Sequence, residues 1–163
     1  MIGVFAVPLV ASADASTTAT FAWDAHLIGT FKPTGIDCVT VHGCELLVSG
    51  SGTWTGDFTG TDTFTGVVYQ QQNGQFVYTI QNAVLSGTVK HCGTGSALAD
   101  LTGAVTGLQF PPAGGTGYAT WRIVPGGTGQ LAGASAGGTE TDFFGANGQV
   151  TAHAQGTITC PVS

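Results

Sequence analysis

Residues 53–68 read TWTGDFTGTDTFTGVV, a stretch in which threonines alternate with large apolar residues and glycines. Trp54, Phe58 and Phe64 share one parity, whereas the threonines between them share the other. Successive side chains of a β-strand point to opposite faces of the sheet. The period of two therefore predicts strands with one buried face and one face in contact with solvent.

Runs with the same strand chemistry recur along the chain between glycine-rich breaks. They cover residues 18–31, 45–59, 61–71, 75–91, 97–108, 117–124, 134–144 and 149–160. Asn73-Gly74 and Asn147-Gly148 each separate two runs, and this dipeptide is typical of two-residue hairpin turns. Residues 114–117 and 126–129 are interpreted as loops. Long strands joined by short turns leave unpaired edges unless the sheet closes. We therefore expect an all-β fold, an eight-stranded antiparallel β-barrel with few or no helices.

Composition supports one small β domain. The chain has 163 residues, of which 42% are hydrophobic and only 7% are charged, enough for one core and no second domain. Lys, Glu and Arg, which usually cover exposed helix faces, are scarce. With a net charge of −6 and no basic cluster, neither a nucleic acid nor an anionic membrane surface is an expected partner.

Residues 1–15 are predicted to be the remnant of an export signal, and residues 16–163 a single β-barrel domain. Residues 2–10 form an apolar run too short to span a bilayer, followed by small residues that suit cleavage. No Lys or Arg precedes the run, and an ordinary N-terminal strand is the alternative. The export signal predicts a secreted, extracellular protein.

The chain contains four cysteines, Cys38, Cys44, Cys92 and Cys160. An even number of cysteines in an exported chain indicates disulfides, and three pairings are open. Cys38 and Cys44 enclose a short loop, which favours this pair and leaves Cys92 with Cys160. No metal site is expected, because no CxxC-like spacing occurs and His91 and His153 have no spacing typical of metal ligands.

Two segments carry a family resemblance. Residues 120–133 read TWRIVPGGTGQLAG and are followed by Gly138-Thr139, and residues 50–60 read GSGTWTGDFTG. Together they resemble the allene oxide cyclase-like barrels, a group that includes plant dirigent proteins and a large bacterial family of small barrels. The resemblance implies an eight-stranded antiparallel barrel, often a homo-oligomer, with a mostly apolar cavity. Members of known activity steer the cyclisation or coupling of a reactive small molecule.

The chain departs from the family at a position that bears on function. The bacterial family commonly has a Glu in the glycine-rich strand after the LAG motif, and the matching residue here is Gly137. No catalytic residue of the plant proteins is carried over. No cofactor is expected either, because the glycine-rich residues 127–132 lack the βαβ context of a dinucleotide-binding site.

Several residues are candidates for a ligand site. Arg122 is the sole arginine, and it lies either on the surface or inside the barrel. An inward Arg122 would need an acidic partner, for which Glu140 and Asp142 are the candidates. Asp24 and His26 share one parity of the first run, where they face water, a partner subunit or a ligand.

Three functions follow as hypotheses. The first is a secreted barrel that binds a small apolar ligand, with Tyr78, Tyr118, Trp121 and Arg122 as lining residues. The second is a cyclase or isomerase in which one acid or base assists a reactive substrate. Its candidate groups are Asp24, His26, Glu140 and Asp142. The third is a structural or surface-interaction protein without a pocket.

Overall fold

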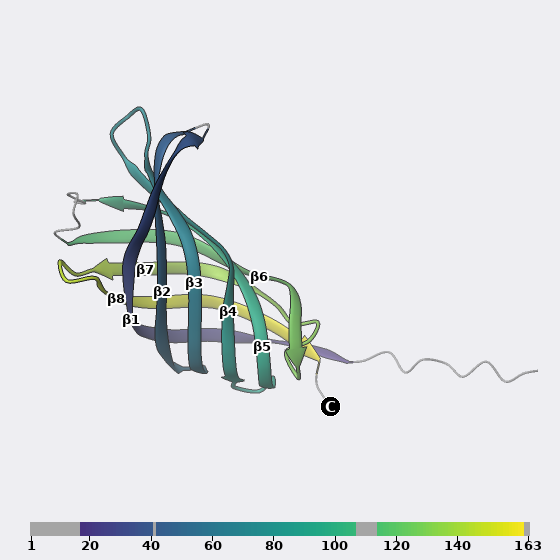
Figure 1. Ribbon diagram of the computed structural model, residues 1–163. Helices are drawn as coiled ribbons and strands as arrows, with labels where there is room; N and C mark the ends of the chain where they lie inside the picture. Colours follow the sequence, from purple (N-terminus) through teal and green to yellow (C-terminus); the bar gives the residue numbers. More distant parts are fainter. Residues whose placement is uncertain (1–16, 41, 107–113, 162–163) are drawn as a thin grey trace, which may run out of the picture.

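The computed structural model describes residues 17–40, 42–106 and 114–161. In these ranges eight antiparallel strands form one closed barrel in sequence order (Figure 1). The strands are β1 (Thr18–Thr40), β2 (Gly43–Gly56), β3 (Phe58–Gln70), β4 (Phe76–Val89), β5 (Gly93–Thr106), β6 (Gly115–Gly129), β7 (Ser135–Phe144) and β8 (Gln149–Pro161). None of the described residues is helical, so the predicted fold class is confirmed. Across the same ranges there is no helix with the length and hydropathy needed to cross a bilayer.

The first and last strands close the barrel. β1 pairs with β2 along one edge and with β8 along the other, from Thr18 opposite Pro161 to Thr30 opposite Gln149. Up to Thr30, β1 therefore has a paired strand on both sides, and no sheet edge with unpaired backbone groups remains there. Avoiding such an edge is the reason for which the sequence pattern predicted a closed barrel. The predicted export segment, residues 1–15, lies outside the described residues.

Two predicted turns differ in detail from the expectation. Gln71 N donates to Gln75 O and Gly145 N donates to Gln149 O, so each hairpin has a three-residue loop. Only the glycine of each Asn-Gly pair has a positive φ, 84° at Gly74 and 78° at Gly148. A two-residue type I′ turn needs a positive φ at both residues, whereas a three-residue loop needs it only at the glycine.

Strands β1, β5 and β6 extend furthest beyond their predicted ends. β1 continues to Thr40 because residues 35–40 pair with β2, with register shifts after Pro33 and Asp37 that accommodate irregular backbone. β5 begins at Gly93 and β6 covers Gly115–Gly129. The segments 115–117 and 126–129 are therefore strand and not loop, because glycines there pair with neighbouring strands.

A bulge in β4 reverses the inward parity of that strand. The register with β5 shifts between Ile80 and Ala83, and Asn82 has a φ of 54°. Ile80 and Ala83 consequently both line the interior, although they differ in parity. The backbone N–H of Asn82 donates to Asp100 Oδ1 at 3.0 Å, which replaces the missing ladder bond.

The end of the barrel that carries the β2–β3, β4–β5 and β6–β7 connections is filled by side chains. Phe58 and Leu131 are 1% and 2% exposed there, and the cavity left among their neighbours is about 10 Å³. The Cys92–Cys160 disulfide ties the β4–β5 turn to the last strand at this end. The Cys38–Cys44 disulfide joins β1 to β2 near the opposite end. Both expected pairings are confirmed.

Candidate ligand cavity

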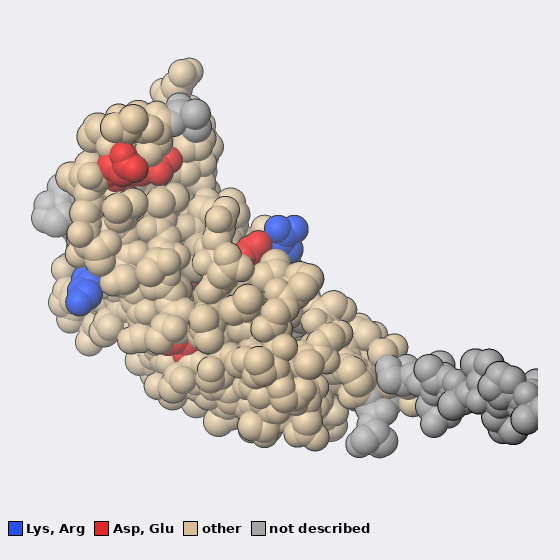
Figure 2. Space-filling model, turned by 45° about the vertical axis from the view of Figure 1, so that its right-hand side comes forward, with Lys and Arg blue, Asp and Glu red and all other residues tan. Residues whose placement is uncertain are grey.

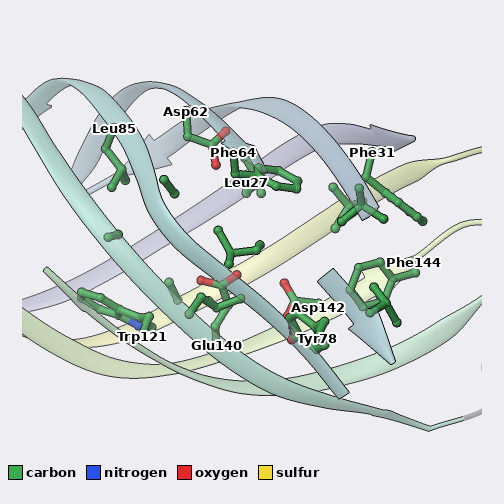
Figure 3. A pocket seen from close by; sticks show the side chains of 18 of the residues that line it. Leu27, Phe31, Asp62, Phe64, Tyr78, Leu85, Trp121, Glu140, Asp142 and Phe144 are labelled. Atoms are coloured by element: carbon green, nitrogen blue, oxygen red, sulfur yellow. Dashed lines mark hydrogen bonds between the residues drawn. The ribbon is translucent and has the colours of Figure 1, made fainter. Parts of the chain in front are cut away.

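A cavity of about 120 Å³ lies inside the barrel, between the packed end and the opposite end. All eight strands contribute to its lining, which is almost entirely apolar (Figure 3). The aromatic lining residues are Trp23, Phe31, Trp54, Phe64, Tyr78, Trp121 and Phe144. Along a regular strand every second residue reaches the cavity, because each strand of a closed barrel has one inward face.

Three carboxyl groups break this apolar lining. Asp62 of β3 and Glu140 and Asp142 of β7 are 7%, 9% and 3% exposed, and all three line the cavity. Glu140 and Asp142 are two residues apart on one strand and therefore share the inward face. Buried carboxyl groups are unusual because the ionised form loses its hydration.

Tyr78 reaches Asp142 across two intervening strands. Its hydroxyl donates a hydrogen bond to Asp142 Oδ2. The path crosses Gly103 of β5 and Gly117 of β6, where an added Cβ would come within 2.5 Å and 2.9 Å of the Tyr78 hydroxyl. A residue larger than glycine at position 103 or 117 would therefore displace the Tyr78 ring. The edge of Phe144 completes the contact, with ring centroids 5.7 Å apart.

The two carboxyl groups of β7 differ in how strongly their surroundings favour the protonated form. Burial raises the pKa of Glu140 well above its ordinary value, and the neighbouring Asp142 charge raises it further. Burial also raises the pKa of Asp142, but hydrogen bonds from Glu140 and Tyr78 oppose this rise. Glu140 is therefore the group of the pair that holds a proton more strongly, and Asp142 accepts the hydrogen bond from Tyr78. Burial and the Asp142 charge raise the pKa of Tyr78, so its hydroxyl remains a donor.

Asp62 has a different environment from the β7 pair. It lies opposite Gly52 of β2, and burial raises its pKa. Its Oδ1 has no hydrogen-bond partner, and neither has the Nε1 of Trp54 or of Trp23. Buried polar atoms normally have partners. The indole of Trp54 nevertheless lies close enough to Asp62 to oppose the rise in its pKa.

No basic side chain neutralises the interior carboxyl groups. The three basic residues of the chain all lie on the outer surface. Lys90 pairs with Asp57 at 3.5 Å, and Arg122 pairs with Asp100 at 3.0 Å. Few charged side chains interrupt the uncharged surface in Figure 2. The cavity lining thus contains three acidic side chains and no Lys or Arg.

The structure divides the candidate residues between the two faces of the barrel. Tyr78, Trp121 and Glu140 line the cavity. Tyr118 is 63% exposed and Arg122 lies on the surface, because the inward residues of β6 are the odd-numbered ones. Of the two alternatives left open for Arg122, the structure shows the surface one, so the pairing that an inward Arg122 would need with Glu140 or Asp142 does not occur.

Asp24 and His26 also lie on the outer surface. Both side chains are more than half exposed, whereas the odd-numbered residues of β1 face inward. They are not among the residues that line the cavity.

Sequence reasoning missed Asp62 and the indoles of Trp23 and Trp54 as site residues. The alternation in residues 53–68 did indicate an inward Asp62, because Asp62 has the same parity as Phe58 and Phe64. Gly137, which the resemblance aligned with a Glu, lies opposite Arg122 on β6. The same strand supplies Glu140 and Asp142 to the cavity instead.

No protein-family model matches the chain, and no curated protein matches it.

Proposed function

We propose that the barrel binds a small, largely apolar molecule whose one polar group contacts Glu140, Asp142 and Tyr78. The observation that supports this function is an apolar cavity with a hydrogen-bonded carboxyl pair in its wall. A buried apolar cavity of about 150 Å³ is large enough for a benzene ring. The volume of about 120 Å³ therefore suits a ligand of about one ring or a short branched chain.

The charge of the cavity selects among such ligands. An anionic ligand would meet the Asp142 carboxylate with no basic residue nearby, which is very costly in a region of low dielectric constant. A neutral ligand with a hydrogen-bonding group, or a cation, would be accepted. The faces of Trp23, Trp54 and Trp121 add favourable sites for a cation.

Secretion and family membership are part of this proposal. Two disulfides suit an oxidising, extracellular compartment. The resemblance to allene oxide cyclase-like barrels is consistent with a closed eight-stranded barrel around an apolar cavity. A purely structural role would need no such cavity.

Binding is tested with three one-ring probes of different charge: toluene, benzylamine and benzoate. Tryptophan fluorescence reports occupancy, because three indoles line the cavity. We expect saturable binding of toluene and benzylamine and none of benzoate. Asp142→Asn should weaken the binding of benzylamine relative to that of toluene, whereas Asp100→Asn, on the outer surface, should leave both unchanged. Failure of all three probes to saturate, or equal binding of benzoate, would contradict the proposal.

An acid-assisted isomerase is the second candidate, favoured by the two neighbouring carboxyl groups of β7, of which Glu140 holds a proton more strongly. Glu140 can give its proton to a ligand oxygen, while Asp142 stabilises the positive charge that develops. With an epoxide, the protonated C–O bond breaks, a hydride shifts from the neighbouring carbon to the cationic carbon, and the carbonyl oxygen so formed returns the proton to Glu140. No redox change is involved.

Styrene oxide tests this chemistry, since its acid-catalysed rearrangement to phenylacetaldehyde is an isomerisation through a benzylic cation. We expect turnover above the buffer rate that is lost in Glu140→Gln and retained in Glu45→Gln, a change outside the cavity lining. Turnover that does not exceed the buffer rate, or that survives Glu140→Gln, would exclude Glu140 as the acid.

A further inference from the structure

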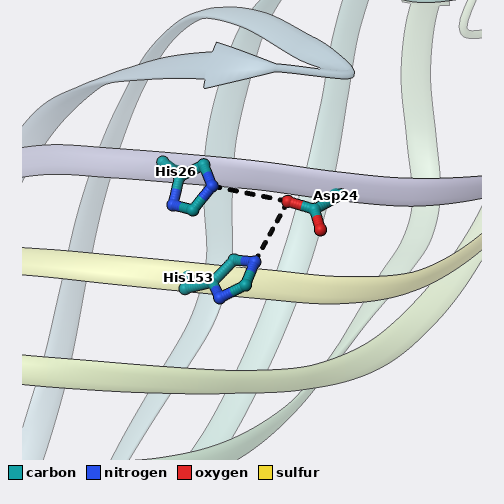
Figure 4. A group of neighbouring side chains, drawn as sticks. All are labelled: Asp24, His26 and His153. Atoms are coloured by element: carbon teal, nitrogen blue, oxygen red, sulfur yellow. Dashed lines mark hydrogen bonds and ion pairs between the residues drawn. The ribbon is translucent and has the colours of Figure 1, made fainter.

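Three ligating side chains meet on the outer face of the barrel where β1 and β8 pair. Asp24 and His26 belong to β1, and His153 belongs to β8 directly opposite His26 (Figure 4). Asp24 and His26 are two residues apart, so the strand presents both on the same face. Barrel closure thus brings together residues separated by more than a hundred positions.

The distances within this group suit one metal ion. Asp24 Oδ1 lies 3.0 Å from His153 Nε2 and 3.5 Å from His26 Nε2, and the three ligand atoms are all within 4.8 Å of one another. Ligand atoms about 2.0–2.1 Å from a tetrahedral Zn²⁺ are about 3.3 Å apart. We propose that Asp24, His26 and His153 form a binding site for a divalent transition-metal ion, with Zn²⁺ as the ion of best geometric fit.

The carboxylate is already held in a ligating orientation. Gln155 Nε2 donates to Asp24 Oδ2 at 3.0 Å, which leaves Oδ1 directed towards the two imidazoles. Such outer hydrogen bonds commonly orient metal ligands in proteins.

The site has room for the ion and for water. The side chains of Asp24, His26 and His153 are 51%, 57% and 37% exposed. The two imidazole rings are stacked, with centroids 4.3 Å apart and an interplanar angle of 14°. Both nitrogen lone pairs can converge on one ion only after the rings turn, and exposed side chains allow this rotation. Water would complete the coordination.

Ligand type narrows the choice of ion. Two imidazoles and one carboxylate favour zinc, copper, nickel or cobalt over calcium and magnesium, which prefer oxygen ligands. An ion pair between Asp24 and a protonated histidine is the competing explanation for the group. Exposed pairs of this kind contribute little to stability.

The test is a calorimetric titration of the untagged, chelator-treated protein with Zn²⁺. We expect one saturable site per chain. His26→Ala, His153→Ala and Asp24→Asn should each weaken Zn²⁺ binding at least about tenfold. His42→Ala is the matched control, because His42 stacks on Tyr69 at a centroid distance of 4.1 Å, outside this group. It should bind Zn²⁺ like the wild type.

Histidine NMR provides a second readout that does not depend on the variants. Zn²⁺ should shift the ring signals of His26 and His153 and leave those of His42 and His91 unchanged. Mg²⁺ at the same concentration should shift none of them. Absence of saturable Zn²⁺ binding, or binding that all three substitutions leave intact, would overturn the proposal. The site lies on the opposite side of the barrel wall from the ligand cavity, so neither outcome bears on ligand binding there.

Discussion

Tyr78 is the residue on which the polar part of the cavity depends. It brings a hydroxyl from β4 to Asp142 of β7, and Gly103 and Gly117 leave the space through which it passes. A hydrogen bond to a charged acceptor contributes about 1.5–3 kcal/mol to stability. The contact therefore stabilises the fold as well as the charge of the site.

Removing this hydroxyl tests its contribution. Tyr78→Phe should lower the free energy of unfolding by about 1.5–3 kcal/mol, because the Asp142 carboxylate loses a donor. Tyr118→Phe removes a hydroxyl from a residue that is 63% exposed and should change stability by less than about 0.5 kcal/mol. Urea unfolding at one pH measures both. Equal effects of the two substitutions would show that the buried hydrogen bond has no special role.

At the scale of the element, the β4 bulge decides which residues of that strand enter the barrel. Before the bulge, Tyr78 and Ile80 face inward, and after it Ala83 and Leu85 do so. Asn82 allows this change of parity because its side chain tolerates a positive φ of 54°.

Substitutions at the bulge should separate backbone conformation from side-chain packing. Asn82→Val should destabilise the protein by about 1–2 kcal/mol, because a β-branched residue is strained in the left-handed region. Asn82→Gly should retain nearly wild-type stability. Gln81→Val places the same side chain at the preceding exposed position, which does not have a positive φ. If thermal unfolding gives the same loss for both valine variants, backbone strain is not the cause.

At the scale of the whole molecule, the two disulfides should contribute unequally to stability. Cys92–Cys160 spans 68 positions and Cys38–Cys44 spans 6. The chain-entropy relation gives about 4.4 kcal/mol for the longer loop and about 2.4 kcal/mol for the shorter one. Cys92 and Cys160 are also buried, whereas Cys38 and Cys44 are exposed. In guanidinium unfolding, replacing the Cys92–Cys160 pair by alanines should lower stability more than replacing the other pair.

The buried carboxyl groups should make stability depend on pH. Burial raises the folded-state pKa values of Glu140 and Asp142 above their ordinary values of 4.5 and 3.8. Their contribution is fully present below these ordinary values and is lost as the pH rises through the folded-state pKa values. Asp24 and Asp100, whose pKa values are lowered, lose their contribution only as the pH falls below 3.8.

We therefore expect the free energy of unfolding to fall as the pH rises above the ordinary carboxyl pKa values. Glu140→Gln should flatten this dependence because it removes one buried ionisation. Glu45→Gln, whose side chain does not line the cavity, should retain the wild-type slope. Urea unfolding across a pH series measures the slopes, and a Glu140→Gln variant that keeps the full slope would contradict the assignment.

The sequence by itself determined the fold class. The period of two in residues 53–68 and its recurrence between turns predicted antiparallel strands and a closed barrel, which the structure confirms. The cysteine spacing favoured the observed disulfides. Parity within a regular strand also assigns Trp54, Phe58 and Asp62 to one face. These features are local, because alternation and turn chemistry depend on neighbouring residues.

Only the tertiary structure decided which groups meet. The bulge at Asn82 breaks the parity rule, and no glycine marks it in the sequence. Tyr78 and Asp142 are 64 positions apart, and their contact requires the register of four strands. His26 and His153 become neighbours through the pairing of the first strand with the last. Register and closure result from pairing of distant segments, so local chemistry could not specify either site.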